Sequence, residues 1–115
     1  MKEVSKVWGE ELWIVNNEKY CGKLLFLNKG ATCSYHYHKI KQETFYCLGG
    51  DIRLKVGSKY YTLNPGTMPQ TINPKMPHSF TGITDAVILE ISTHHEDDDV
   101  VRLKESEASI YQDNP

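Results

Sequence analysis

The sequence lacks a long apolar run, a cysteine scaffold and a strong net charge. No stretch approaches the roughly 20 apolar residues of a membrane-spanning helix, and the opening MKEVSKVWGEELW lacks the apolar core of a secretion signal. A formal net charge of −2 gives no reason to expect a nucleic-acid or anionic-membrane partner. The three cysteines are odd in number and are not spaced like a disulfide framework. We therefore expect buried free thiols and a cytoplasmic protein.

Short strand-like stretches fill most of the chain. GKLLFL (22–27), ETFYCL (43–48) and AVILEIS (86–92) are rich in apolar, β-branched and aromatic residues, and Asn-Asn, Gly-Gly and Asn-Pro-Gly turn signals separate such stretches. Gly57 and Ser58 mark a tight hairpin between two of them. Because little room is left for helices, the pattern predicts an all-β sandwich or barrel.

Length and composition predict one domain over residues 1–115. The chain is long enough to enclose one core, and 39% apolar with 24% charged residues is a globular composition. We expect the core over about residues 7–103. The polar residues 104–115, which end in proline, are expected to form a short helix or a C-terminal tail.

Three histidines and one glutamate form a candidate metal site. His36 and His38 are two apart in a strand-like stretch, so their side chains point to the same face. If the chain turns back after them, Glu43 on the next strand can meet them. His78 follows two prolines that stiffen its approach. Three imidazoles and a carboxylate suit a divalent transition metal: Mn, as the first choice, or Fe, Co, Ni or Zn.

The spacing of these residues resembles the cupins. Their first motif is a Gly, five residues, His-x-His, three or four residues, a Glu, six residues and a second Gly. Gly30, His36, His38, Glu43 and Gly50 reproduce that motif. The resemblance implies a small cupin β-barrel, or jelly roll.

The second cupin motif is only partly present. Pro65, Gly66 and His78 match it, but the proline and glycine are adjacent, the gap to the histidine is longer, and the final Asn is missing. The resemblance implies that His78 completes the metal ligands begun by the first motif.

A narrower resemblance covers nearly the whole chain. KVWGEELWIV, SYHYHKIKQETFYCLGG and ILEISTHHEDDDVVRL are similar to segments of the type II mannose-6-phosphate isomerase-like cupins, which include the D-lyxose isomerases. The Tyr-Gly-Arg that usually follows the closing arginine is absent after Arg102. The resemblance implies an aldose–ketose isomerase and leaves sugar and sugar phosphate both open as substrates.

Glu90 and Lys41 are the candidate catalytic residues. Glu90 interrupts an apolar strand, where it is a base if it points inward and a surface charge if it points outward. Lys41 lies where the isomerase-like cupins carry a basic residue, and it is either a sugar ligand or a solvated turn lysine. Lys23, within GKLLFL, has the same two alternatives, a sugar ligand or a solvated lysine. We expect Arg102 to pair with an aspartate of the preceding acidic run.

Two other functions use the same site. A cupin dioxygenase also binds Fe or Ni through three histidines and a glutamate, and a non-catalytic cupin could bind a sugar or a sugar nucleotide. The His-His-Glu-Asp-Asp-Asp run at 94–99 is interpreted as a solvated charge run without an ion. Because a small barrel has sheet edges to cover, we expect a homodimer.

Overall fold

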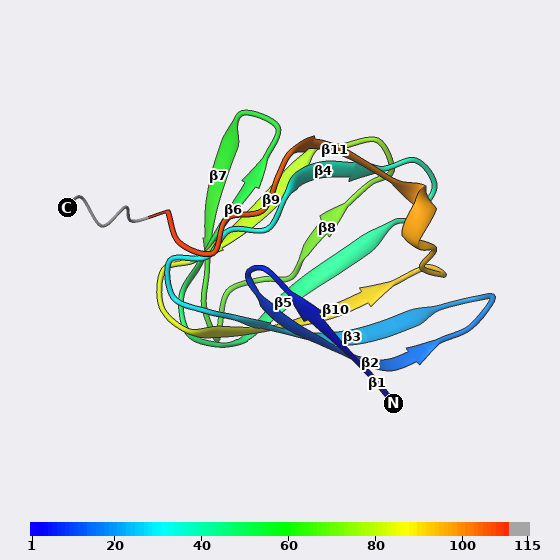
Figure 1. Cartoon of the computed structure of the whole chain (residues 1–115), viewed down its shortest axis with the longest axis horizontal. Helices are drawn as coiled ribbons and strands as arrows, with labels where there is room; N and C mark the ends of the chain where they lie inside the picture. Colours follow the sequence, from blue (N-terminus) through cyan, green and yellow to red (C-terminus); the bar gives the residue numbers. More distant parts are fainter. Residues whose placement is uncertain (111–115) are drawn as a thin grey trace.

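Two antiparallel sheets packed face to face make up the protein. The computed structural model describes residues 1–110, and Figure 1 shows the two sheets enclosing a common interior. One sheet has the strand order β1-β2-β3-β10-β5-β8, and the other has the order β11-β4-β9-β6-β7. The prediction of an all-β fold is confirmed.

The strands alternate with short turns, and one 3-10 helix, η1, lies before the last strand. The bounds are β1 (Lys2–Lys6), β2 (Gly9–Asn16), β3 (Cys21–Leu27), β4 (Tyr35–His38), β5 (Glu43–Gly49), β6 (Ile52–Val56), β7 (Lys59–Leu63), β8 (Gln70–Ile72), β9 (His78–Gly82), β10 (Ala86–Ser92), η1 (Asp97–Asp99) and β11 (Val100–Lys104). The Gly57–Ser58 hairpin lies between β6 and β7, as predicted.

Alternate residues of β3, β5 and β10 face the interior. Along β3, Cys21, Lys23, Leu25 and Leu27 are buried while the residues between them are partly exposed. This is the period of two that a half-buried strand requires. Apolar side chains from both sheets form the core, and some of them, including Trp8, Phe45 and Phe80, also line the pocket that holds the polar site.

The Trp8–Gly9 pair at the start of β2 packs against the core. The Trp8 ring packs edge-on against Phe80, with ring centroids 5.3 Å apart. Gly9 has a φ of 151°, and a Cβ at this position would lie 1.8 Å from the carbonyl oxygen of Phe26. Only glycine allows β2 to pass this close to β3.

The three cysteines are buried and unpaired, as predicted. After β11 the chain forms no helix over residues 105–110, and Glu107 makes an isolated bridge to Thr32. The expectation of a helix or tail over 111–115 lies outside the described residues. Within residues 1–110 no helix is long and apolar enough to cross a membrane.

Candidate metal centre and pocket

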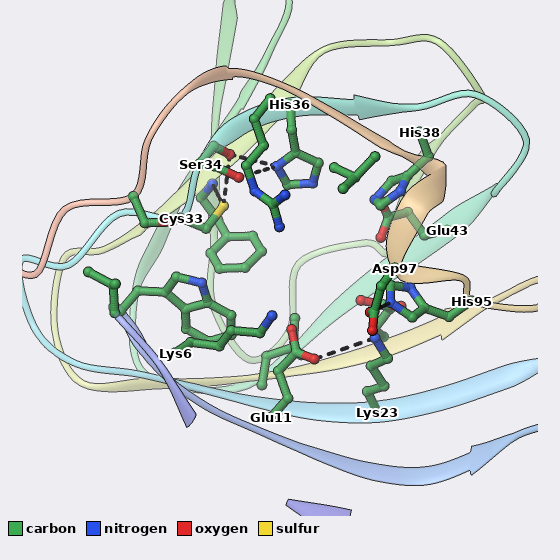
Figure 2. A pocket seen from close by; sticks show the side chains of 18 of the residues that line it. Lys6, Glu11, Lys23, Cys33, Ser34, His36, His38, Glu43, His95 and Asp97 are labelled. Atoms are coloured by element: carbon green, nitrogen blue, oxygen red, sulfur yellow. Dashed lines mark hydrogen bonds and ion pairs between the residues drawn. The ribbon is translucent and has the colours of Figure 1, made fainter. Parts of the chain in front are cut away.

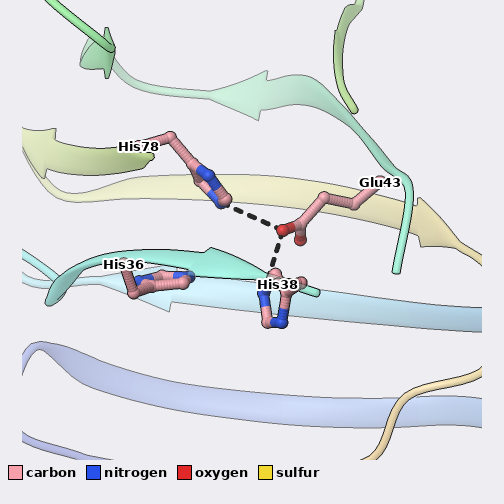
Figure 3. A group of neighbouring side chains, drawn as sticks. All are labelled: His36, His38, Glu43 and His78. Atoms are coloured by element: carbon pink, nitrogen blue, oxygen red, sulfur yellow. Dashed lines mark ion pairs between the residues drawn. The ribbon is translucent and has the colours of Figure 1, made fainter. Parts of the chain in front are cut away.

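The structure brings together all four predicted metal-site residues. His36 and His38 lie on β4, His78 starts β9 and Glu43 starts β5. His36 and His78 are register partners across β4 and β9. One ligand atom from each of the four residues lies within 4.8 Å of the others, and Figure 3 shows the side chains converging on one point. The three histidines therefore come from one sheet and the glutamate from the other.

Backbone carbonyls orient two of the imidazoles. His36 Nδ1 lies 2.7 Å from the carbonyl oxygen of Ser34, and His78 Nδ1 lies 2.9 Å from that of Met76. Because a carbonyl only accepts hydrogen bonds, both Nδ1 atoms must carry the proton. The Nε2 atoms then present lone pairs, which is the arrangement found around metal-bound histidines.

The buried polar atoms at the centre of the cluster lack hydrogen bonds. Glu43 Oε1 lies 3.1 Å from His38 Nε2 and 3.0 Å from His78 Nε2. Neither contact has hydrogen-bond geometry, which leaves Glu43 Oε1, His78 Nε2 and His38 Nδ1 buried and unsatisfied. Unsatisfied buried polar atoms are costly. A cation bound between them would satisfy the two that face the centre, so the donor set fits a divalent metal.

The protonation states also suit a cation. Burial lowers the pKa of His36 to about 3, with a further contribution from His78. Burial alone would raise the pKa of Glu43, but contacts with His38, His78 and Lys41 outweigh it and hold that pKa well below its usual value. His36 is therefore neutral and Glu43 ionised at neutral pH, which are the forms that coordinate metals.

Three residues of the cluster, His36, His38 and Glu43, line a pocket of about 340 Å³. Figure 2 shows Glu11 and Lys23 across the pocket from the histidines. Both predicted catalytic residues, Lys41 and Glu90, are buried and also line the pocket. The interpretations of Lys41 as a solvated turn lysine and of Glu90 as an outward surface charge are therefore wrong.

Lys41 links the metal cluster to Glu90. Its Nζ lies 3.2 Å from Glu90 Oε2, 3.6 Å from Glu43 Oε2 and 3.0 Å from His95 Nδ1. Burial alone would lower the pKa of Lys41, but Glu90 and Glu43 outweigh it and raise that pKa above its usual value. The side chain is thus a fixed cation between two carboxylates.

His95 and Asp97 extend this network outward, and the sequence did not reveal them. His95 Nε2 donates to Asp97 Oδ1 at 2.9 Å, while Nδ1 accepts from Lys41. Burial, with the nearby charge of Lys41, lowers the pKa of His95 to about 4. In the sequence, His95 follows the strand that carries Glu90, which could have indicated that it lies near the site. The acidic residues after it favoured the interpretation as a solvated charge run instead.

Lys23 belongs to the pocket as well. It is almost fully buried, its Nζ lies 3.4 Å from Glu11 Oε1, and it stands 4.1 Å from the centre of the Trp13 ring. A lysine at an inward position of β3 was visible in the sequence. Its partners were not, because they come from a different strand.

The expected pairing of Arg102 with an aspartate is wrong. Asp99 instead accepts hydrogen bonds from the backbone N–H groups of Lys39, Ile40 and Lys41 at 3.0 to 3.1 Å. Three local donors satisfy this carboxylate, so it does not need the arginine. Arg102 is exposed, lines the pocket and pairs with none of the residues in the described part of the chain.

Comparison with known proteins gives a family and several related folds. The family model for the cupin domain (Cupin_2) matches residues 23–92. The D-lyxose/D-mannose isomerase of Thermosediminibacter oceani is 35% identical, over 73% of this chain and 61% of that protein. The chain thus spans less than two thirds of the length of this relative.

Solved structures share the fold at low identity. Pac13, a nucleoside dehydratase, superposes with a TM-score of 0.78 at 11% identity, covering 96% of this chain and 92% of Pac13. The L-ribose isomerase of Cellulomonas parahominis has a TM-score of 0.69 at 16% identity, covering 76% of this chain and 61% of that one. These likenesses support the two-sheet architecture described above.

Proposed function

This chain belongs to the cupin domain family, and from that premise we propose that it is a metal-dependent aldose–ketose isomerase acting on a small sugar or sugar phosphate. Because cupin folds serve many functions, the site has to carry the argument. The observation that carries it is the buried Lys41–Glu90 pair beside the His/Glu cluster, since sugar isomerisation needs a proton carrier next to a charge-stabilising centre.

We assign His36, His38, Glu43 and His78 as the metal ligands. Their unsatisfied inward-facing atoms and converging Nε2 atoms support this assignment. Mn(II) is our first choice, and Fe, Co, Ni and Zn are compatible with the same donors. When bound, such an ion supplies a Lewis acid that stabilises negative charge on the oxygens of a bound sugar.

We assign Glu90 as the base that moves a proton between adjacent sugar carbons. Its Oε2 accepts from Lys41 and from Ser92 Oγ, each at 3.2 Å. Within residues 1–110 no group donates to Oε1, and Glu90 lines the pocket. One oxygen is thus held in place while the other is free to take a proton from a substrate.

Lys41 acts in this proposal as a fixed positive charge. Its raised pKa keeps it protonated at neutral pH, so it is a poor base but a good partner for an oxygen that gains negative charge. It also holds Glu90 in a set orientation through the 3.2 Å contact. Of the two candidate catalytic residues, the electrostatics therefore favour Glu90 as the proton carrier.

A monosaccharide suits the dimensions of the pocket. Its volume of about 340 Å³ is near the lower end of the range for ligand sites. The related T. oceani protein is a D-lyxose/D-mannose isomerase, so these aldoses and their ketoses are the first substrates to test. Lys6 and Arg102 line the pocket without ion-pair partners among residues 1–110, and either could meet a hydroxyl or a phosphate.

The test is solvent proton exchange in heavy water. The Mn(II)-loaded protein is incubated with D-lyxose, D-mannose, L-ribose, the corresponding ketoses and their phosphates, and proton NMR follows each sugar. We expect loss of the carbon-bound proton next to the carbonyl, together with the appearance of the isomer. With the His36→Ala variant, which lacks a proposed ligand, we expect neither the proton loss nor the isomer.

The isomerase proposal for these sugars would be overturned if no sugar in the panel showed proton exchange or isomer formation. The protein used must be shown to hold one metal ion per chain. Oxygen consumption by the Fe(II)-loaded protein would instead indicate a dioxygenase. Sugar binding without turnover, measured by calorimetry, would indicate a binding protein.

A further inference from the structure

A second hollow, which we call the outer groove, lies on the outer face of the five-stranded sheet. Its volume of about 350 Å³ is close to that of the pocket beside the metal cluster and lies within the roughly 300–1,000 Å³ of small-molecule sites. In Figure 1 the β6–β7 hairpin and the last described residues, which both border it, lie at the same end of the molecule. The side chains that matter here are Tyr35, Arg53, Lys55, Tyr60, Ser79 and Thr81.

Two pairs of a basic and a hydroxyl-bearing side chain line the outer groove. Arg53 and Lys55 flank the core residue Leu54 on β6, so both point away from the core. On β9, Thr81 is the register partner of Arg53, and Ser79 is the register partner of Lys55. The Cβ atoms of such partners lie about 4.5–5.5 Å apart, so each basic side chain lies beside a hydroxyl group.

The two hydroxyl-bearing residues are buried although they lie on an outward face. Ser79 and Thr81 are each only 7% exposed. Thr81 Oγ1 lies 2.8 Å from Thr32 Oγ1, whereas Ser79 Oγ forms a hydrogen bond with no group among residues 1–110. A buried hydroxyl group without a partner is costly. Because Ser79 lines the outer groove, a molecule bound there would supply the missing partner.

Two tyrosine rings position the basic side chains of the outer groove. Lys55 Nζ lies 4.7 Å from the centre of the Tyr35 ring and 5.8 Å from that of the Tyr60 ring. Arg53 Cζ lies 5.4 Å from the centre of the Tyr60 ring. Such cation–π contacts hold a cation without neutralising it. Neither Arg53 nor Lys55 has an ion-pair partner among residues 1–110, so both charges remain available to a ligand.

The other charged residues of the outer groove leave these two cations unneutralised. Lys104 pairs with Glu107 at 3.3 Å. Glu105 is exposed and lines both the outer groove and the pocket beside the metal cluster, so it lies where the two adjoin. Two positive charges with a hydroxyl donor match a phosphate group, which has about 1.5–2 negative charges at neutral pH and three acceptor oxygens. A carboxylate, with a single charge, is a poorer match.

We propose that the outer groove binds the phosphate group of a small phosphorylated metabolite, with Arg53, Lys55 and Ser79 as the donors. The volume of the outer groove leaves room beside the phosphate for a sugar or a nucleoside, which would pack against the rings of Tyr35 and Tyr60. This site is independent of the proposed isomerase activity, because its donors point outward while the metal cluster lies between the sheets. Either proposal can fail while the other stands.

The test is calorimetric titration of the Mn(II)-loaded protein with inorganic phosphate. We expect a dissociation constant of about 1 mM or lower. Arg53→Gln and Lys55→Gln should each raise it at least about tenfold, because each removes a charge-assisted hydrogen bond to the phosphate. Ser79→Ala, which removes the third donor, should weaken binding in the same direction. Circular dichroism and Mn(II) binding establish that each variant is folded.

Lys59→Gln is the matched control for the loss of one positive charge. Lys59 is exposed on the same β6–β7 hairpin but does not line the outer groove. We expect its substitution to change the dissociation constant by less than about twofold. An effect of Lys59→Gln equal to that of Lys55→Gln would overturn the proposal, because binding would then follow overall charge rather than this site.

Three further ligands identify the source of the phosphate group: D-mannose 6-phosphate, AMP and unphosphorylated D-mannose. Tighter binding of the sugar phosphate than of AMP would indicate a phosphorylated sugar, and the reverse would indicate a nucleotide. D-mannose binding that Lys55→Gln weakens as strongly as phosphate binding would overturn the assignment of a phosphate site.

Two other results would overturn the proposal. One is a folded native protein that binds none of the phosphate-bearing ligands at about 10 mM. The other is phosphate binding that is lost in Arg102→Gln but native in Arg53→Gln and Lys55→Gln, because the phosphate would then lie in the pocket beside the metal cluster.

Discussion

Glu90 is the residue on which the proposed chemistry depends most directly. Glu90→Gln keeps the shape of the side chain but cannot take a proton, so we expect solvent exchange of the substrate proton to fall by about 10²–10⁴-fold. Metal content, measured by mass spectrometry of the metal, should not change, because Glu90 is not a proposed ligand. Exchange at the native rate in a metal-loaded Glu90→Gln variant would show that another group carries the proton.

His95 makes the stability of the metal-free protein depend on pH. The imidazole has a pKa of about 4 in the folded chain and about 6.5 when unfolded, so only the unfolded chain binds a proton here between these values. The His95 contribution is complete above pH 6.5, is lost progressively as the pH falls to about 4, and changes no further below that. Its size is at most ~3 kcal/mol.

Urea unfolding of the chelated protein from pH 4 to 8 measures this effect, with His95→Gln as the comparison. As the pH falls through that window, the free energy of unfolding should decrease more in the native protein than in the His95→Gln variant. Since the low pKa of His36 acts in both proteins, it does not affect the difference. If the free energies of unfolding of the two proteins changed with pH in parallel, the pKa of His95 would be the same in the folded and unfolded chains.

At the scale of single elements, strand alternation was the most informative feature of the sequence. It predicted that His36 and His38 share a face, and the structure places Glu43 beside them, as expected if the chain turned back after His38. Alternation could not orient Glu90 or Lys23, because either face of a strand can hold a charged residue when a partner is available. The partners, Lys41 and Glu11, come from other elements and are set by tertiary packing.

The helix η1 is expected to hold the turn that carries Lys41. Asp99 accepts three backbone N–H groups from residues 39–41, and an amide side chain would lose the charge that strengthens these bonds. We expect Asp99→Asn to lower the free energy of unfolding by roughly 1–3 kcal/mol in urea titrations. Asp98→Asn is the matched control: its side chain is exposed in the same helix, and it should change stability by less than ~0.5 kcal/mol. Equal effects of the two substitutions would contradict this role.

The close approach of β2 to β3 makes Gly9 intolerant of a side chain. Gly9→Ala would place a Cβ 1.8 Å from the Phe26 carbonyl oxygen, so one strand would have to move. We expect a loss of at least ~2 kcal/mol in thermal or urea unfolding, from the clash and the positive φ together. At Gly49 a Cβ would meet nothing within 4 Å, so Gly49→Ala should be nearly neutral. A native melting temperature for Gly9→Ala would refute this explanation of the Trp-Gly pair.

At the scale of the whole molecule, composition and turn spacing were enough to predict an all-β barrel-like domain, and the ligand spacing predicted the cluster. The path after β10 was not predictable in the same way. Arg102 and His95 lie in segments whose conformation depends on contacts with β4 and with the turn before β5. Sequence spacing gives no information about such contacts, and both residues were misinterpreted for this reason.

Metal binding should stabilise the entire fold. An ion that binds only the folded chain, at 100 times its dissociation constant, adds about 2.7 kcal/mol. For a domain of this size that corresponds to a rise in melting temperature of about 10 °C. Differential scanning fluorimetry with and without EDTA measures it, and His36→Ala should melt at the same temperature in both. A native protein insensitive to EDTA after Mn(II) loading would contradict a metal bound by these four residues.

The division of the cluster between the two sheets has a consequence for the timing of biosynthesis. His78 leaves the ribosome some 35 residues after Glu43, and the sheets must meet before all four side chains converge. A nascent chain that ends before β9 offers an incomplete site, which should hold metal weakly and exchange it freely. The four side chains can therefore hold an ion together only after β9 has been synthesised and the two sheets have packed against each other.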